Sequence, residues 1–139
     1  MSLKSCNTLL KMLAETKLQS LILNEMDLSD EHIKTVKDLL QGNKFLKKLV
    51  LTANNFSIEG ALYLSKGLVC NSTIRYLDLS HNKLGSKSIQ LICESLYDNT
   101  SMKSLFLNGN QMDNDCVPAL LKLIANSKFP LRELHIAHN

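Results

Sequence analysis

Ile74-Arg-Tyr-Leu77-Asp-Leu79-Ser-His-Asn82, near the middle of the 139-residue chain, follows the pattern L-x-x-L-x-L-x-x-N, in which L is an apolar residue. Four more segments fit it, with Met26 replacing the final asparagine in the first, and they begin at Leu18, Leu46, Met102 and Leu131. The starts at 18, 46, 74, 102 and 131 are separated by 28, 28, 28 and 29 residues. A period this constant indicates a repeat architecture.

The residues between these segments have the apolar spacing of a helix face, i, i+3 and i+7. The four sets are Ile33, Val36 and Leu40; Ala61, Leu64 and Leu68; Ile89, Ile92 and Leu96; and Val117, Leu120 and Ile124. Helix-capping side chains precede them at Ser29, Ser57, Ser86 and Asp113. Asparagines follow them, and we expect these to adopt the left-handed conformation that commonly ends a helix: Asn43, Asn71, Asn99 and Asn126.

The sequence therefore predicts one strand and one helix in each repeat. We expect strands over 20–24, 48–52, 76–80, 104–108 and 133–137. We expect helices over 30–41, 58–70, 86–98 and 114–126. Leu9, Met12 and Leu13 fit the helix of an incomplete leading repeat.

Repeats of 28 and 29 residues with a full helix resemble the ribonuclease-inhibitor-like class of leucine-rich repeats. The stretch from Asn71 to Gly85 is similar to the repeats of intracellular nucleotide-binding immune receptors. Related repeats occur in activators of the Ran GTPase and in tropomodulin-like actin regulators. The resemblance covers roughly residues 5–139 and implies an α/β leucine-rich-repeat solenoid. Met26 stands where this family has asparagine or cysteine, which leaves a gap in the expected row of asparagines.

A single strand and helix cannot bury both faces, so we expect the repeats to stack into a right-handed horseshoe. The expected architecture has a concave parallel β-sheet, convex α-helices and about five repeats. We assign residues 1–139 to a single domain, and we expect it to be a fragment of a longer protein. Its parts are a leading partial repeat at 5–17, repeats at 18–45, 46–73, 74–101 and 102–130, and a truncated repeat at 131–139.

Alternation along a strand gives a map of the concave surface, because the leucines of L-x-L point inward and the residues beside them point outward. The candidate partner-binding residues in this map are Ile22, Lys48, Val50, Tyr76, Asp78, Phe106, Asn108 and His135. Aromatic and apolar side chains facing outward are typical of interfaces. They also suit strands for conformational reasons alone, and the sequence leaves both explanations open.

A basic rim occupies one further position of the repeat. Gln19 is followed at the equivalent positions by four cations, Lys47, Arg75, Lys103 and Arg132. Like charges about 5 Å apart repel by roughly 0.8 kcal/mol in water. The cost is small enough for a merely solvated rim, and an anionic partner surface is the alternative.

Composition limits the class of partner. The net charge of +3 is too small to imply nucleic acid or an anionic membrane, tryptophan is absent, and no apolar run approaches the roughly 18 residues of a membrane span. The pair His135 and His138 lacks further ligands at zinc-like spacing. We therefore expect no metal, no cofactor and no membrane contact, and nucleic acid is disfavoured. Exposed solenoid ends would allow homo-oligomers.

The cysteines indicate a reducing compartment. None of Cys6, Cys70, Cys93 and Cys116 forms a Cys-x-x-Cys pair, and the chain does not begin with a secretory leader. We expect a cytoplasmic protein whose Cys70, Cys93 and Cys116 are reduced, structural residues of the helical layer.

The predicted function is a protein–protein interaction scaffold that binds its partner on the concave face. No nucleophile signature or phosphate-binding glycine loop is present, so we expect no enzyme. Two alternatives follow from the resemblance: a ligand-sensing module of an innate-immune receptor, and a GTPase-activating module similar to the Ran regulators. No catalytic residue of the latter can be matched to a position here.

Overall fold

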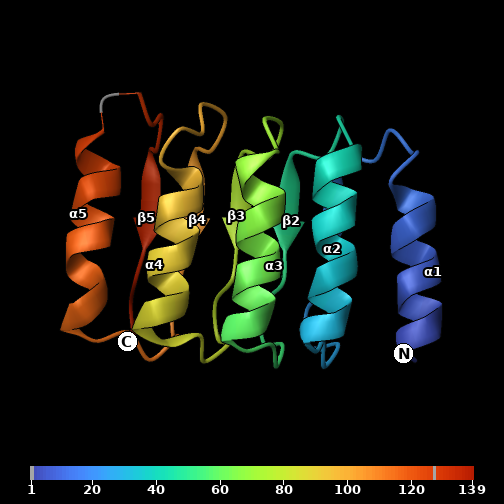
Figure 1. Ribbon diagram of the computed structural model, residues 1–139, viewed down its shortest axis with the longest axis horizontal. Coiled ribbons are helices and arrows are strands. Elements are labelled where there is room, and N and C mark those ends of the chain that lie inside the picture. The colour runs from blue at the N-terminus through green and yellow to red at the C-terminus, as the bar shows by residue number, and fades with distance from the viewer. Residues whose placement is uncertain (1, 127) are drawn as a thin grey trace.

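Helices and strands alternate along the chain in the computed structural model, which describes residues 2–126 and 128–139 (Figure 1). The strands are β1 Ser20–Ile22, β2 Lys48–Val50, β3 Tyr76–Asp78, β4 Ser104–Phe106 and β5 Glu133–His135. The helices are α1 Leu3–Leu13, α2 Asp30–Gly42, α3 Ile58–Val69, α4 Gly85–Leu96 and α5 Val117–Ala125, with a 3₁₀ turn η1 at Asn114–Cys116. The expected strand–helix repeat is confirmed, although each strand is shorter than its expected range.

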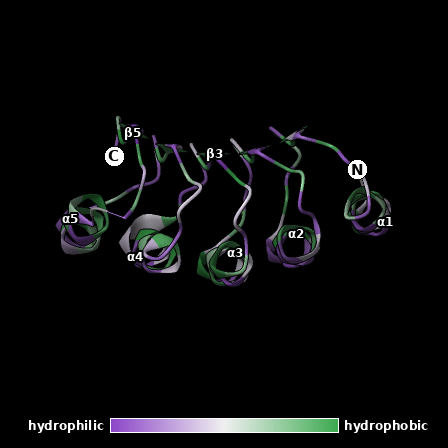
Figure 2. Cartoon of the chain, turned by 90° about the horizontal axis from the view of Figure 1, so that it is seen from above, coloured by the Kyte–Doolittle hydropathy of each residue, from purple (hydrophilic) through white to green (hydrophobic). Residues whose placement is uncertain are grey.

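The strands form one parallel sheet in the order β1-β2-β3-β4-β5. The strand register follows the sequence repeat, because each residue pairs with the residue at the equivalent position of the next repeat. Leu49 pairs with Leu77, and Leu77 pairs with Leu105. The helices form a second layer on one side, and seen from above the two layers bend together (Figure 2). The α/β leucine-rich-repeat architecture is thus confirmed.

The core lies between the two layers. The inward leucines of the middle strands, such as Leu49, Leu77 and Leu105, are fully buried. Each buried leucine contributes roughly 1.5–3 kcal/mol of transfer free energy. The last strand is different, because Ile136 remains 46% exposed at the edge of the sheet.

An asparagine at the end of each later strand bonds to the preceding repeat. We call Asn54, Asn82, Asn110 and Asn139 the strand-end ladder. Asn54 donates through Nδ2 to the Leu23 carbonyl at 2.8 Å, and its Oδ1 accepts from the backbone N–H groups of Met26 and Leu28. The Asn54 N–H donates to Oδ1 of Asn82 at 2.9 Å, and the Asn82 N–H donates to Oδ1 of Asn110 at 3.1 Å. Met26 therefore joins the ladder through its backbone alone.

The turn that carries this ladder requires a left-handed residue just before each asparagine position. Positive φ angles occur there at Glu25, Ala53, His81, Gly109 and His138. Only Gly109 adopts this conformation without a steric penalty. A side chain at Gly109 would also meet the His81 ring. The sequence pattern did not predict this recurrent strain.

A second row of asparagines follows the helices, as the sequence indicated, but its hydrogen bonds to the preceding repeat were not predicted. We call Asn43, Asn71, Asn99 and Asn126 the helix-end ladder. The Nδ2 groups of Asn71, Asn99 and Asn126 donate to the carbonyls of Leu40, Asn71 and Tyr97, each in the preceding repeat. Their Oδ1 atoms accept from backbone N–H groups of the following turn. The expected left-handed conformation is wrong: none of the four has a positive φ, because the amide rather than the backbone closes the turn.

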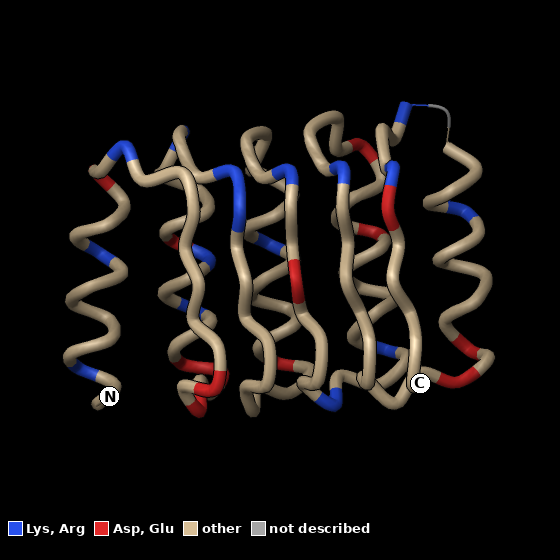
Figure 3. Tube along the Cα trace, turned by 180° about the vertical axis from the view of Figure 1, so that it is seen from behind, with Lys and Arg blue, Asp and Glu red and all other residues tan. Residues whose placement is uncertain are grey.

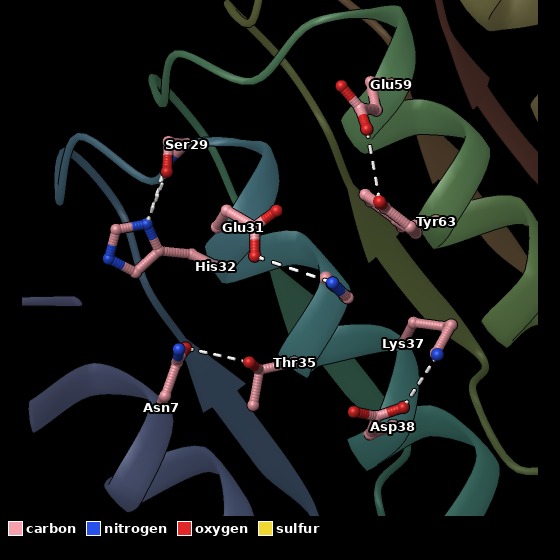
Figure 4. Close-up of polar contacts among 10 residues, drawn as sticks. Asn7, Ser29, Glu31, His32, Thr35, Lys37, Asp38, Glu59 and Tyr63 are labelled. Atoms are coloured by element: carbon pink, nitrogen blue, oxygen red, sulfur yellow. Dashed lines mark hydrogen bonds and ion pairs between the residues drawn. The ribbon is translucent and has the colours of Figure 1, made fainter. Parts of the chain in front are cut away.

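The helix starts agree only in part with the expected caps. Ser29 and His32 form a capping box on α2, and Thr35 of α2 donates to Asn7 of α1 at 2.8 Å (Figure 4). Ser57 caps α3, and Asp113 caps η1. Ser86 is not a cap, because α4 begins at Gly85. Its hydroxyl donates instead to the Asp113 carboxylate in the next repeat.

The expected apolar face of the last helix is wrong at two of its three residues, while Leu120 is buried as expected. Val117 and Ile124 are exposed, whereas Cys116, Leu120 and Leu123 are buried. The η1 turn precedes α5 and shifts the inward face by one residue. The outer side of α5 therefore presents Val117, Leu121 and Ile124 to solvent.

All four cysteines are free thiols. Cys93 is buried in the helical layer, and burial raises the pKa of its thiol to about 12. Cys6 and Cys116 are buried too. Cys70 departs from the expectation, because it lies exposed at the end of α3 and is not part of the core.

The strand-end ladder predicts a large stability effect for one amide. Asn82→Ala removes the bonds to the buried Leu51 and Leu79 carbonyls and to the Asn54 N–H. The Asn54 N–H would be buried without a partner, at a cost of about 1–3 kcal/mol. Each carbonyl would lose one hydrogen bond of about 0.5–1.5 kcal/mol but keep another, from Asn54 to Leu51 and from Asn110 to Leu79. We therefore expect the free energy of unfolding in urea to fall by about 2–6 kcal/mol. The exposed Asn24→Ala serves as the control and should change it by about 0.5 kcal/mol or less. Equal effects of the two substitutions would contradict the ladder's role.

Candidate functional site

The last residue of each strand belongs to one outward row on the concave face. The register places Ile22 beside Val50, Val50 beside Asp78, Asp78 beside Phe106 and Phe106 beside His135. The preceding row places Lys48 beside Tyr76. Because neighbouring strands lie about 4.8 Å apart, these side chains lie side by side across the sheet.

Four of these side chains form a continuous contact that we call the aromatic run: Lys48, Tyr76, Phe106 and His135. Nζ of Lys48 lies 4.5 Å from the centre of the Tyr76 ring. The Tyr76 and Phe106 ring centres are 4.8 Å apart, with an interplanar angle of 33°. The His135 ring stacks on Phe106 at 4.3 Å and 19°. The run extends over strands β2 to β5 and ends in polar groups on both sides.

The phenol of Tyr76 stays protonated well above neutral pH. Burial raises its pKa, and the negative charges of Asp78 and Glu133 raise it further. Tyr76 therefore offers a hydroxyl donor and acceptor beside an apolar ring, and this combination suits an interface.

The other predicted partner-binding residues are placed less uniformly. Ile22 is 56% exposed on the edge strand, whereas Val50 is only 6% exposed. Val50 faces outward as expected, but it lies between flanking strands and offers little surface, so its role in partner binding stays a prediction. Asp78 accepts the Ser80 N–H at 2.9 Å, and Asn108 accepts the Ala137 N–H at 2.8 Å. Both are therefore partly engaged in the fold.

The basic rim lies where the strands begin. The N–H groups of Lys47, Arg75, Lys103 and Arg132 donate in turn to the carbonyls of Gln19, Lys47, Arg75 and Lys103, at 2.8–2.9 Å. Figure 3 shows Lys and Arg at the same end of four neighbouring strands. The backbone thus aligns the four cations that the sequence assigned to this rim.

Sequence reasoning missed one hollow on each side of the molecule. On the helical side, a hollow of about 530 Å³ lies between α4 and the η1–α5 segment, where Lys122 lies 5.0 Å from the centre of the Tyr97 ring. Beside the rim, a second hollow includes Lys44, which stands outside the repeat position used for the surface map. Neither follows from periodicity, because both depend on how adjacent repeats pack.

No group of three or more His, Cys, Asp or Glu side chains suited to a metal ion occurs within residues 2–126 and 128–139. In the same described part, no helix is both long and apolar enough to cross a bilayer.

Comparison with known proteins gives relatives in sequence. Residues 70–93 match the family described as leucine-rich repeat. The chain is 30% identical over 132 residues to human NACHT, LRR and PYD domains-containing protein 14, a match that covers 94% of this chain and 12% of that protein. It is 30% identical over 114 residues to Protein CARMIL of Dictyostelium discoideum, covering 76% of this chain and 11% of that protein. The chain thus spans only a small part of these relatives.

Solved structures show the same fold. One titled leiomodin-1 actin-binding site 2 has a TM-score of 0.77 at 17% identity and covers 89% of this chain and 70% of that one. The tropomodulin C-terminal domain of Caenorhabditis elegans has a TM-score of 0.81 at 20% identity and covers 99% of this chain and 83% of that one. At these identities the likeness concerns the fold alone.

The aromatic run predicts a change in the nuclear magnetic resonance spectrum. The His135 ring protons lie over Phe106 and should be shifted by its ring current, so Phe106→Leu should return them toward the position of a free histidine. The free energy of unfolding should change by about 1 kcal/mol or less, because Phe106 is partly exposed. His81, outside the run, is the internal control. Unmoved His135 protons would contradict the stacking.

Proposed function

Because the chain belongs to the leucine-rich-repeat family, we propose that it is a protein–protein interaction module whose concave face holds the partner. The observation that carries this proposal is the aromatic run. Its rings lie on the concave face of the sheet, on the side away from the helical layer.

Interface energetics favour this face. Tyrosine and other aromatics provide large contact area at a low entropic cost, and a few such anchors dominate binding. Tyr76 and Phe106 are already stacked, so less side-chain freedom is lost when a partner covers them. Exposed Ile22 and the polar ends of the run, Lys48 and His135, extend the contact. Strand propensity accounts for rings in strands, but it does not require them to stack on neighbouring strands.

Actin is the first partner to test. One similar structure is that of actin-binding site 2 of leiomodin-1, whose fold this chain shares. The ligand-sensing and GTPase-activating alternatives would also use a solenoid surface, and no residue of this chain favours either of them. We propose binding and not catalysis.

We propose a cytoplasmic location for the module. The four free thiols support it, and the exposed Cys70 in particular suits a reducing compartment.

A partner site on the concave face predicts that one pair of aromatic substitutions weakens partner binding and that a matched pair on the helical side does not. Tyr76→Ala with Phe106→Ala should weaken binding of purified actin by at least about tenfold, because each central anchor contributes roughly 2 kcal/mol or more. Tyr63→Ala with Tyr97→Ala, on α3 and at the end of α4, is the control and should leave the affinity within about twofold. Titration calorimetry with purified actin measures the affinities of both double variants, and thermal unfolding confirms that the variants fold.

A reversed pattern would exclude the concave face. If the helical-side pair abolishes binding while the concave pair binds normally, the partner occupies the helices instead.

A further inference from the structure

A hollow of about 470 Å³ opens where β2, β3 and β4 begin, beside the turns that follow α3 and α4. Four cations line it, namely Lys44, Lys47, Arg75 and Lys103. Hydroxyl side chains form the rest of its wall, including the exposed Ser72 and Thr100, and no carboxylate belongs to the lining. The wall can therefore donate charged and neutral hydrogen bonds to an anion.

These cations lack a counter-charge within the part of the chain that the structure describes. The ion pairs found there, Lys34 with Glu31 and Lys37 with Asp38, both belong to α2. Lys47 donates to the neutral Gln19 amide at 3.1 Å, and Lys44 donates to the Gln41 carbonyl. The positive charge of the hollow therefore remains available to a ligand.

Backbone hydrogen bonds hold the cations close together. The Arg75 N–H donates to the Lys47 carbonyl and the Lys103 N–H donates to the Arg75 carbonyl, both at 2.8 Å, which fixes one cation per strand. At a strand spacing of about 4.8 Å, the row from Lys47 to Arg132 spans roughly 14 Å. An extended peptide rises about 3.3 Å per residue, so a segment of about five residues matches the row.

We propose that this hollow and the adjoining basic rim bind an acidic, extended segment of the partner protein, through its Asp and Glu carboxylates. The inference rests on the proposed protein-binding function, since Lys47 adjoins Lys48 and the rim is thereby continuous with the aromatic run. A peptide fits better than a nucleic acid. The net charge of the chain is only +3 and tryptophan is absent, whereas nucleic-acid surfaces are strongly basic and often carry stacking aromatics.

The test uses a hexaglutamate peptide carrying an uncharged fluorophore, titrated with the whole chain at low salt. Lys47→Gln, Arg75→Gln and Lys103→Gln together should weaken binding by at least about tenfold, which corresponds to about 1.4 kcal/mol. The control combines Lys66→Gln, Lys87→Gln and Lys122→Gln on α3, α4 and α5. It removes the same charge and should weaken binding by less than about threefold. A hexaglutamine peptide should not bind.

Other outcomes separate this inference from the proposed function. The variant with both Tyr76→Ala and Phe106→Ala should still bind hexaglutamate normally. If the concave face turns out not to bind a partner, the peptide titration therefore still tests the hollow. Equal weakening by the two triple variants, or no saturable binding of the peptide, would overturn the inference. Tighter binding of a single-stranded oligonucleotide through the same three cations would overturn it in favour of nucleic acid.

Discussion

Each strand-end asparagine bonds to its own strand and to the repeat before it, so two adjacent repeats share every step of the ladder. Asn82 bonds the Leu51 and Leu79 carbonyls and accepts the Asn54 N–H in a site that is almost fully buried. The helix-end ladder repeats the arrangement at the other end of the repeat. The two rows fix each repeat at both ends, and they offset the cost of the left-handed residues in the turns.

The same constraint produces the surface. Because every strand starts in one register, outward residues of equal repeat position stand side by side. The aromatic run and the basic rim are therefore consequences of the ladder, although neither contributes to it. Their residues vary between repeats while the asparagines and leucines stay, which is the division expected of a scaffold that carries a binding surface.

The repeat period was sufficient to predict the fold. In the pattern L-x-x-L-x-L-x-x-N the apolar positions are the buried residues, and the final asparagine is the residue that closes the turn. The rows of the concave map and the alignment of the rim followed from alternation alone. The packing of individual side chains could not be predicted in this way. The burial of Val50, the stacking of His135 on Phe106 and the hollow beside Lys44 depend on neighbours one repeat away. The helix-end asparagines were visible as a row, but their spacing could not distinguish an amide bond from a left-handed backbone.

The central claim is that the concave face holds the partner, and site-specific photo-crosslinking tests it most directly. A benzophenone amino acid at position 106 lies on the concave face, and one at position 63 lies on α3. If the concave face holds the partner, the probe at position 106 crosslinks to it and the probe at position 63 does not. An excess of chain without the probe should abolish the crosslink from position 106. Crosslinking from position 63 with none from position 106 would contradict the claim.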